Sequence, residues 1–279
     1  MIPVAAWRYI VSRVREQFPD TLFFLEGLGG KISVTREILN TANFNWAYSE
    51  LFQNYDRGQV VRHMALVQDI AEADGQMIHF AETHDNNRLA SVSKRFARMR
   101  TAVAALMSVG GGFAFANGVE WFATEKIDVH GSPPLNWGAE ENQVDHIRRL
   151  NALLKTHPAF AAGAGQHFVM AQEGNFAVLL RHDRHGENRL LVAANLDADN
   201  AVPARWEDVI EPLADGAFLD LVSEARIRAE KQDNCRQMLL APGQVVCLSN
   251  APGELERIRD FEQAGNRVSA SVVHQQLRA

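Results

Sequence analysis

The chain has 279 residues, of which 47% are hydrophobic and 22% charged, the balance of a folded globular protein. Its formal net charge of −6 disfavours a nucleic-acid or anionic-membrane partner, because phosphate binding needs clustered Lys and Arg. The two cysteines, Cys235 and Cys247, imply no disulfide framework, and no apolar run reaches the roughly 18 residues of a membrane span. We therefore expect a cytoplasmic protein.

The first 160 residues alternate between strand-like and helical patterns. Short apolar runs predict four buried strands, near residues 22–26, 44–48, 77–82 and 112–116. Helical spacing of apolar residues predicts helices at 7–18, 35–39, 59–73, 89–109 and 142–154. This alternation indicates a parallel sheet with right-handed crossovers. Four such units form half of an eight-unit barrel, and a four-stranded open sheet is the alternative.

After about residue 163 the pattern changes to short apolar runs separated by polar turns, which indicates an antiparallel β-sandwich. We expect this β-domain at 164–250, packed on the helix at 142–154 through Ile147, Leu150 and Leu154. Residues 251–279 are predicted to be a polar, weakly helical tail. The expected organisation is thus a half-barrel at 1–160, a β-domain and a tail.

Polar side chains follow two of the predicted strands at the carboxyl end, where barrel enzymes carry their active sites. Glu26 ends an apolar run just before three glycines within four residues. An apolar setting would disfavour its charged form and suit a general acid; an exposed strand-end carboxylate is the alternative. His84, Asp85, Asn87 and Arg88 belong to a run of seven polar residues. A helix cap needs fewer hydrogen-bonding groups, whereas sugars need many.

Three tryptophans, Trp46, Trp121 and Trp137, lie near predicted strand ends or in long loops. Tryptophans in such places more often pack in a core. Close to a polar cluster, however, their flat faces suit the apolar faces of sugar rings.

Two segments together resemble the alpha-amylase superfamily, glycoside hydrolase family 13: residues 22–27 (LFFLEG) and 77–85 (MIHFAETHD). Residues 117–121 (NGVEW) resemble the loop that leaves the family's strand eight. Residues 195–197 (NLD) and 240–245 (LAPGQV) resemble its C-terminal β-domain. The resemblance covers about residues 1–250. It implies strands five to eight of a (β/α)8 barrel, of the TIM type, followed by a small antiparallel β-sandwich.

The resemblance also implies roles for the polar residues. Glu26 would be the acid/base, Asp85 the stabiliser of the transition state, and His84 a ligand for a sugar hydroxyl. Further substrate contacts are expected from Asn87, Arg88, Trp46, Glu120 and Trp121. The substrate would be an α-1,4-linked glucan or maltooligosaccharide, hydrolysed or used in glucosyl transfer, with no metal or cofactor.

One departure from the family pattern concerns the nucleophile. The family uses an Asp at the end of strand four, in a Gly-x-Arg-x-Asp-Ala pattern, and retention needs this carboxylate about 5 Å from the acid/base. No Gly-x-Arg-x-Asp occurs in the 279 residues. We therefore expect a fragment that is inactive alone, with the nucleophile encoded upstream of Met1. We also expect its partner to be the missing N-terminal half-barrel or, by self-association, a second copy of the chain. The alternatives are a non-catalytic glucan- or partner-binding module of the same descent, and an unrelated small α/β binding protein.

Overall fold

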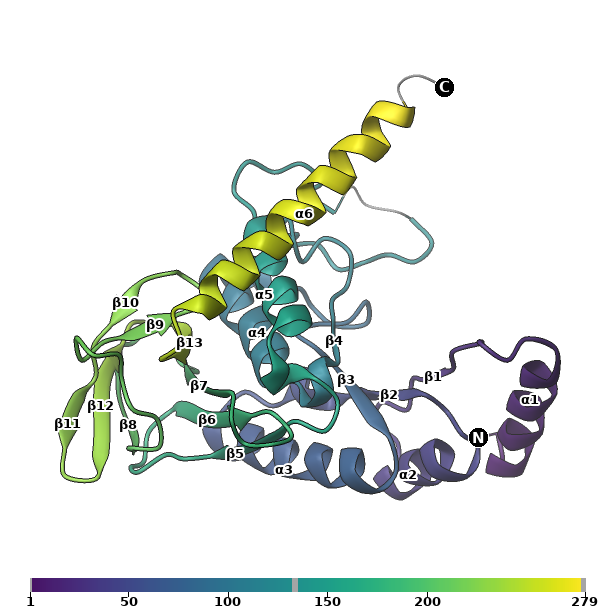
Figure 1. The fold of residues 1–279 in the computed structure, drawn as a ribbon. Helices are drawn as coiled ribbons and strands as arrows, with labels where there is room; N and C mark the ends of the chain where they lie inside the picture. The colour runs from purple at the N-terminus through teal and green to yellow at the C-terminus, as the bar shows by residue number, and fades with distance from the viewer. Residues whose placement is uncertain (1, 132–134, 277–279) are drawn as a thin grey trace.

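The structure, a computed structural model, describes residues 2–131 and 135–276, with the side chains of the last helix described up to Gly265. The N-terminal region holds a four-stranded sheet in the order β1-β2-β3-β4, with each neighbouring pair parallel (Figure 1). Its strands are β1 (Phe24–Leu25), β2 (Trp46–Ser49), β3 (Gln76–Phe80) and β4 (Phe113–Ala114). The prediction of four parallel strands is confirmed, although β1 and β4 are only two residues long.

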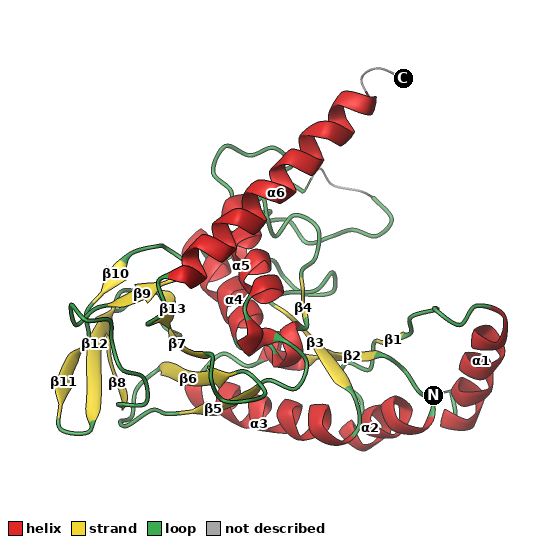
Figure 2. Ribbon diagram, in the orientation of Figure 1, coloured by secondary structure: helices red, strands yellow, loops and turns green. Residues whose placement is uncertain are grey.

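Helices connect and flank these strands (Figure 2). They are α1 (Val4–Gln17), α2 (Ile32–Thr41), α3 (Arg57–Ala73), α4 (Lys94–Leu106) and α5 (Val144–Thr156). The single helix predicted at 89–109 is wrong at its start, where a separate 3-10 turn, η2 (Leu89–Ser91), precedes α4. Ser93 causes the break, because its hydroxyl accepts a hydrogen bond from the Phe96 N–H at 3.0 Å and so caps α4.

The parallel sheet has one face covered by helices and one face more open. On β2, Ala47 is fully buried towards the helices, whereas Trp46 and Tyr48 alternate with it and are only partly buried. Phe24, 47% exposed, stacks on Trp46 with ring centroids 6.4 Å apart, and Tyr48 meets Phe80 edge-on at 4.7 Å. We call the face that carries these four aromatic residues the open face.

Gly112 shows how closely the strands approach at β4. A Cβ at this position would lie 2.5 Å from the carbonyl oxygen of Met77 and 2.8 Å from the Trp46 ring. A larger residue would push β4 away from β3, so glycine is required by contact rather than by its dihedral angles.

The C-terminal region is antiparallel in every pairing that the described residues make. A six-stranded sheet has the order β10-β9-β13-β7-β6-β5, and a three-stranded sheet the order β11-β12-β8. The strands are β5 (Gly165–Phe168), β6 (Phe176–His182), β7 (Arg189–Asn195), β8 (Val202–Glu207), β9 (Phe218–Asp220), β10 (Arg226–Ile227), β11 (Glu230–Gln232), β12 (Cys235–Leu240) and β13 (Val245–Ser249). A core that includes Phe176 and Trp206 joins residues of both sheets.

The last helix corrects the expectation of a weakly helical tail. α6 (Gly253–Gln276) is a continuous helix of 24 residues that packs on α5. Glu254 and Glu256 lie in its first turn, where negative charge favours a helix. Buried Glu254 also anchors this end, because its carboxylate contacts His157 Nε2 at 2.8 Å and accepts a hydrogen bond from the Ser249 hydroxyl. Within the described part of the chain, no helix has both the length and the apolar character needed to cross a bilayer.

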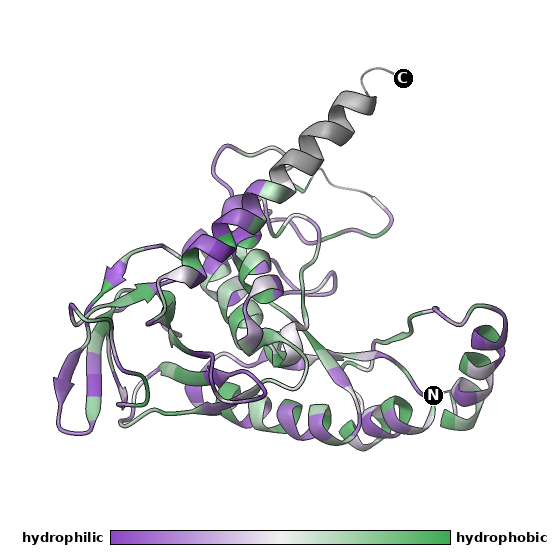
Figure 3. Ribbon diagram, in the orientation of Figure 1, coloured by the Kyte–Doolittle hydropathy of each residue, from purple (hydrophilic) through white to green (hydrophobic). Residues whose placement is uncertain are grey.

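The antiparallel region packs on α4 through β7 and β13. The helix predicted at 142–154, α5, contacts α4 and α6 and also reaches the antiparallel region, where Arg149 forms an ion pair with Glu224. α4 is buried along most of its length, so one core runs from the parallel sheet through Val103 to Val192 and Cys247 of the six-stranded sheet. The strand β6 that contributes to this packing is mostly hydrophobic (Figure 3).

Arg181 of β6 is a charged residue inside this packing. Its side chain is fully buried and donates hydrogen bonds to the carbonyl oxygens of Leu106 at 3.2 Å and Ala159 at 3.1 Å. Its guanidinium lies 4.1 Å from the centre of the Phe160 ring. Burial lowers the pKa of Arg181 to about 9, so it is still a cation at neutral pH. It ties the antiparallel region to the end of α4 and to the 3-10 turn Pro158–Phe160 after α5.

Candidate active site

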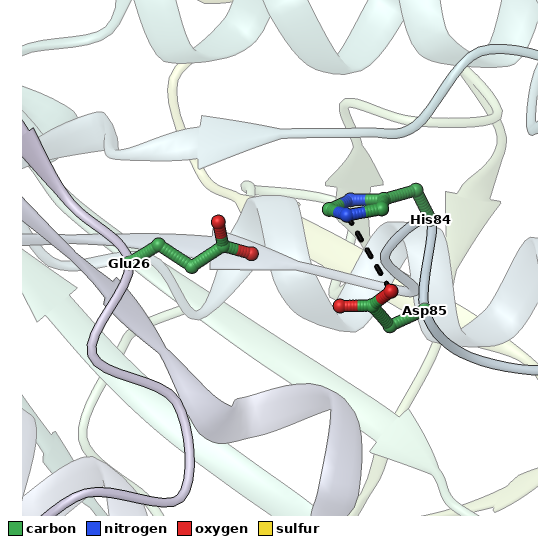
Figure 4. Close-up of side chains that lie close together, drawn as sticks. All are labelled: Glu26, His84 and Asp85. Carbon is green, nitrogen blue, oxygen red and sulfur yellow. Dashed lines mark ion pairs between the residues drawn. The ribbon is translucent and has the colours of Figure 1, made fainter. Parts of the chain in front are cut away.

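The structure brings Glu26 together with His84 and Asp85, which are far from it in sequence. Glu26 follows β1 directly, and the other two lie in the loop after β3; the carboxyl ends of parallel strands meet at one edge. One ligand atom from each residue lies within 4.8 Å of the other two. The Glu26 carboxyl points towards His84 and Asp85, and His84 Nε2 is 3.5 Å from Asp85 Oδ1 (Figure 4).

All three side chains are exposed. The expected apolar setting for Glu26 is therefore wrong, and the alternative of an exposed strand-end carboxylate describes it better. The physical reason is the open face: β1 is short, and no described element covers Phe24. Glu26 lines a cavity of about 310 Å³ together with Lys31 and Thr35, to which His84 and Asp85 do not contribute. The three residues thus meet at an open rim.

The loop that carries His84 and Asp85 is clamped by a buried ion pair. Arg88 is 1% exposed and Glu82 4%, and Arg88 Nε lies 3.1 Å from Glu82 Oε1. Arg88 Nη2 also donates to the Asn117 carbonyl oxygen, and the Leu89 N–H donates to Glu82 Oε2, both at 2.5 Å. Burial raises the pKa of Glu82, against the opposing effects of the Leu89 N–H and Arg88. The loop is thus tied down at both ends.

This clamp corrects the expectation that Arg88 contacts substrate. A guanidinium that is buried and paired inside the protein is not available to a ligand. Asn87, by contrast, is exposed in the same loop and stays a candidate contact. Thr83 shapes the turn that carries His84 and Asp85, because its hydroxyl accepts a hydrogen bond from the Asp85 N–H at 3.3 Å and donates one to Asn86 Oδ1 at 2.5 Å.

The loop after β4 depends on a glycine next to the clamp. Gly118 has φ of +90°, and a Cβ there would collide with the Arg88 guanidinium. Its N–H donates to Glu120 Oε2 at 2.9 Å, so Glu120, expected to bind substrate, shapes this loop. Glu120 and Trp121 line a groove with α5 and α6 to which Glu26, His84 and Asp85 do not contribute.

The two ends of β2 carry one residue that was not predicted, Glu50, and one that was, Trp46. Glu50, at the carboxyl end of β2, accepts a hydrogen bond from the Gly29 N–H and so holds the glycine-rich loop after Glu26. Sequence reasoning missed it, although a carboxylate directly after a strand was the signal used for Glu26. Trp46 lies at the amino end of β2, where it pairs with Phe24. It is therefore farther than Glu26 from the carboxyl edge of the sheet.

The spacing of the three site residues would also permit coordination of a divalent cation, since each offers one ligand atom. Exposed carboxylates often gather without a metal. The arrangement can equally perform chemistry that requires no ion: one carboxyl donates and accepts a proton, a second carboxylate stabilises positive charge, and an imidazole bonds a hydroxyl.

The fold and the site define a parallel β/α protein with an acid and a His–Asp pair at the carboxyl edge of its sheet. No family model matches the chain. The chain is 24% identical to the alpha-1,4-glucan:maltose-1-phosphate maltosyltransferase of Rhodospirillum rubrum over 208 aligned residues. The alignment covers 70% of this chain and 30% of that protein. A maltosyltransferase of Cereibacter sphaeroides is 21% identical over 220 residues, 74% of this chain and 32% of that protein.

Solved structures share the fold. The maltogenic alpha-amylase AmyB of Thermotoga neapolitana superposes with a TM-score of 0.71 at 14% identity, over 90% of this chain and 59% of that one. An alpha-amylase of Lactobacillus plantarum superposes with a TM-score of 0.63 at 17% identity. This superposition covers 88% of this chain and 60% of that one. Together these comparisons show an alpha-amylase-type fold over the part of the chain that they cover, together with a sequence similarity to curated maltosyltransferases. The chain spans about 30% of the length of the curated relatives.

Proposed function

We propose that this chain carries the acid/base part of a retaining alpha-amylase-family active site that acts on α-1,4-linked glucans or maltooligosaccharides. The observation that supports this most directly is the meeting of Glu26, His84 and Asp85 within 4.8 Å at one sheet edge. The relatives named as maltosyltransferases and alpha-amylases support the glucan substrate. In this assignment β1 to β4 correspond to strands five to eight of the barrel.

The proposed reaction divides the chemistry among these side chains. Glu26 protonates the glycosidic oxygen as the bond to the sugar breaks, and later removes a proton from the attacking water or sugar hydroxyl. The Asp85 carboxylate stabilises the positive charge that develops on the sugar ring. His84 holds a sugar hydroxyl, and the Glu82–Arg88 ion pair keeps His84 and Asp85 in position.

The covalent step requires a further carboxylate. We propose that this carboxylate comes from an N-terminal half-barrel, which would cover the open face where Phe24, Trp46 and Phe80 lie. Without it, residues 1–279 alone would be inactive, because none of the described carboxylates stands where the covalent intermediate forms. Whether water or a second sugar accepts the glycosyl group depends on that half, so hydrolysis and transfer both fit.

The test compares maltoheptaose turnover by residues 1–279 with turnover by a longer protein that includes the coding sequence upstream of Met1. We expect activity only in the longer protein, where Glu26→Gln should lower kcat about 10²–10⁴-fold. Glu187→Gln, an exposed carboxylate on the β6–β7 turn, is the matched control and should leave kcat unchanged. Turnover by residues 1–279, or normal activity of the longer Glu26→Gln protein, would contradict the proposal.

A non-catalytic module that binds glucan or a protein partner is the second candidate. The observation that favours it is the open face, with Phe24 47% exposed beside a solvent-exposed Glu26. It predicts that the longer protein binds maltoheptaose without turning it over, and that Glu26→Gln changes neither property.

We also propose a cytoplasmic location, supported by the cysteines. Cys235 and Cys247 are both free, and Cys247 is fully buried. Free thiols persist in reducing compartments. Recovery of the native protein in a cytosolic fraction would support this location, and recovery from the culture medium would contradict it.

A further inference from the structure

A groove separate from the Glu26 site lies between α5, α6 and the loop that follows β4, which run close together in Figure 1. Its volume is about 530 Å³, within the range of small-ligand sites. No described residue lines both this groove and the cavity at Glu26. A ligand held here would therefore be bound independently of the candidate active site.

Aromatic rings form one side of the groove. The Trp121 and Trp137 rings lie 5.4 Å apart with their planes tilted by 46°, so they offer two faces at an angle. Trp137 is 78% exposed, and Phe261 of α6 is 43% exposed. Exposing so much aromatic surface is unfavourable in water, and an exposed apolar patch with a polar rim commonly marks a binding site.

Polar side chains complete the groove. Asn151 of α5 is exposed and offers both a donor and an acceptor, and Glu262 of α6 and Arg148 of α5 add carboxylate and guanidinium groups. Arg148 is balanced by its ion pair with Asp145, so the groove has no excess positive charge to attract phosphates or nucleic acid. Flat apolar faces beside mixed donors and acceptors match a neutral sugar, whose ring has an apolar face and an edge of hydroxyls.

We propose that this groove is a second binding site for α-1,4-linked glucan, in which Trp137 and Trp121 stack on sugar rings and Asn151 bonds their hydroxyls. The choice of an α-glucan over other sugars rests on the proposed function. The site would hold a long glucan chain while another part of it, or another chain, reacts at Glu26. A second copy of this chain is the other occupant that the test distinguishes.

Maltoheptaose is titrated into residues 1–279, and binding is followed by calorimetry and by quenching of tryptophan fluorescence. Trp137→Ala should weaken binding about tenfold or more, the usual effect of removing a central aromatic contact. Tyr9→Ala on α1, also strongly exposed, is the matched control and should bind as the unaltered protein does. Glu26→Gln should likewise retain binding.

The outcomes are distinguishable. Absence of maltoheptaose binding, or a Trp137→Ala protein that binds normally, overturns this inference. A Trp137→Ala protein whose sedimentation changes from dimer to monomer, without any glucan binding by the unaltered chain, identifies a second copy as the occupant and also overturns it. Trp137-dependent binding in a longer protein that lacks glycosidase activity supports the inference while contradicting the proposed function.

Discussion

Replacing Arg88 by Met tests the clamp that holds the His84–Asp85 loop. Methionine keeps much of the volume but leaves the Glu82 carboxylate, 4% exposed, without its cation. Breaking a buried ion pair by removing one partner typically costs about 3–5 kcal/mol. With an m-value of about 3 kcal/mol/M, at the upper end for urea, the unfolding midpoint should fall by about 1–2 M. Arg8→Met, on the exposed surface of α1, should change stability by less than about 0.5 kcal/mol.

The same reasoning predicts a rescue and a pH dependence. Glu82→Gln in the Arg88→Met background should recover part of the loss, because it removes the orphaned charge. Glu82 has a raised pKa in the fold, so its protonated form favours the folded state and this benefit disappears as the pH rises through the folded pKa. The loss in Arg88→Met should thus be larger at pH 8 than at pH 5. A loss below about 1 kcal/mol at pH 8, or no rescue, would refute the importance of the pair.

Two further predictions concern a buried histidine and a glycine. Burial lowers the pKa of His79 to about 3, so acidification favours the unfolded chain, and between pH 7.5 and 5.5 the free energy of unfolding should fall by about 1.4 kcal/mol through this residue. His79→Gln should remove that part of the slope in urea titrations, and an unchanged slope would contradict the assignment. Gly118→Ala should destabilise the protein by about 1–3 kcal/mol more than Gly186→Ala in thermal or urea unfolding, because both glycines have positive φ but only Gly118 also faces Arg88. Equal effects would show that the contact is unimportant.

The parallel sheet could be predicted because its strands are marked locally. The run around Met77 is apolar and bounded by polar residues, and the same pattern recurs around Ala47. Once the strands are parallel, residues that follow them share one edge, so the meeting of Glu26 with Asp85 followed from strand ends alone. Neither inference required knowledge of side-chain packing.

The corrections at Glu26 and Arg88 have a different origin, since both depend on partners distant in sequence. The exposure of Glu26 depends on what covers the open face, which no pattern around residue 26 reports. Arg88 was placed in the site because its neighbours are polar, but its hydrogen-bond acceptor is the carbonyl oxygen of Asn117, 29 residues away. The helix at 253–276 did carry a local signal, the acidic first turn at Glu254, which its polar composition obscured.

Arg181 has a consequence for how the molecule unfolds. Its carbonyl partners, Leu106 and Ala159, belong to the segment before residue 160, whereas Arg181 itself lies in the antiparallel region. Separating the two regions would leave the two carbonyl oxygens without their donor and the guanidinium with Gln166 as its remaining protein acceptor, and would expose the α4 surface that Val192 and Cys247 cover. The boundary near residue 160 therefore divides the sequence but not the cooperative unit, and a cut there would yield two pieces that each lack part of their own core.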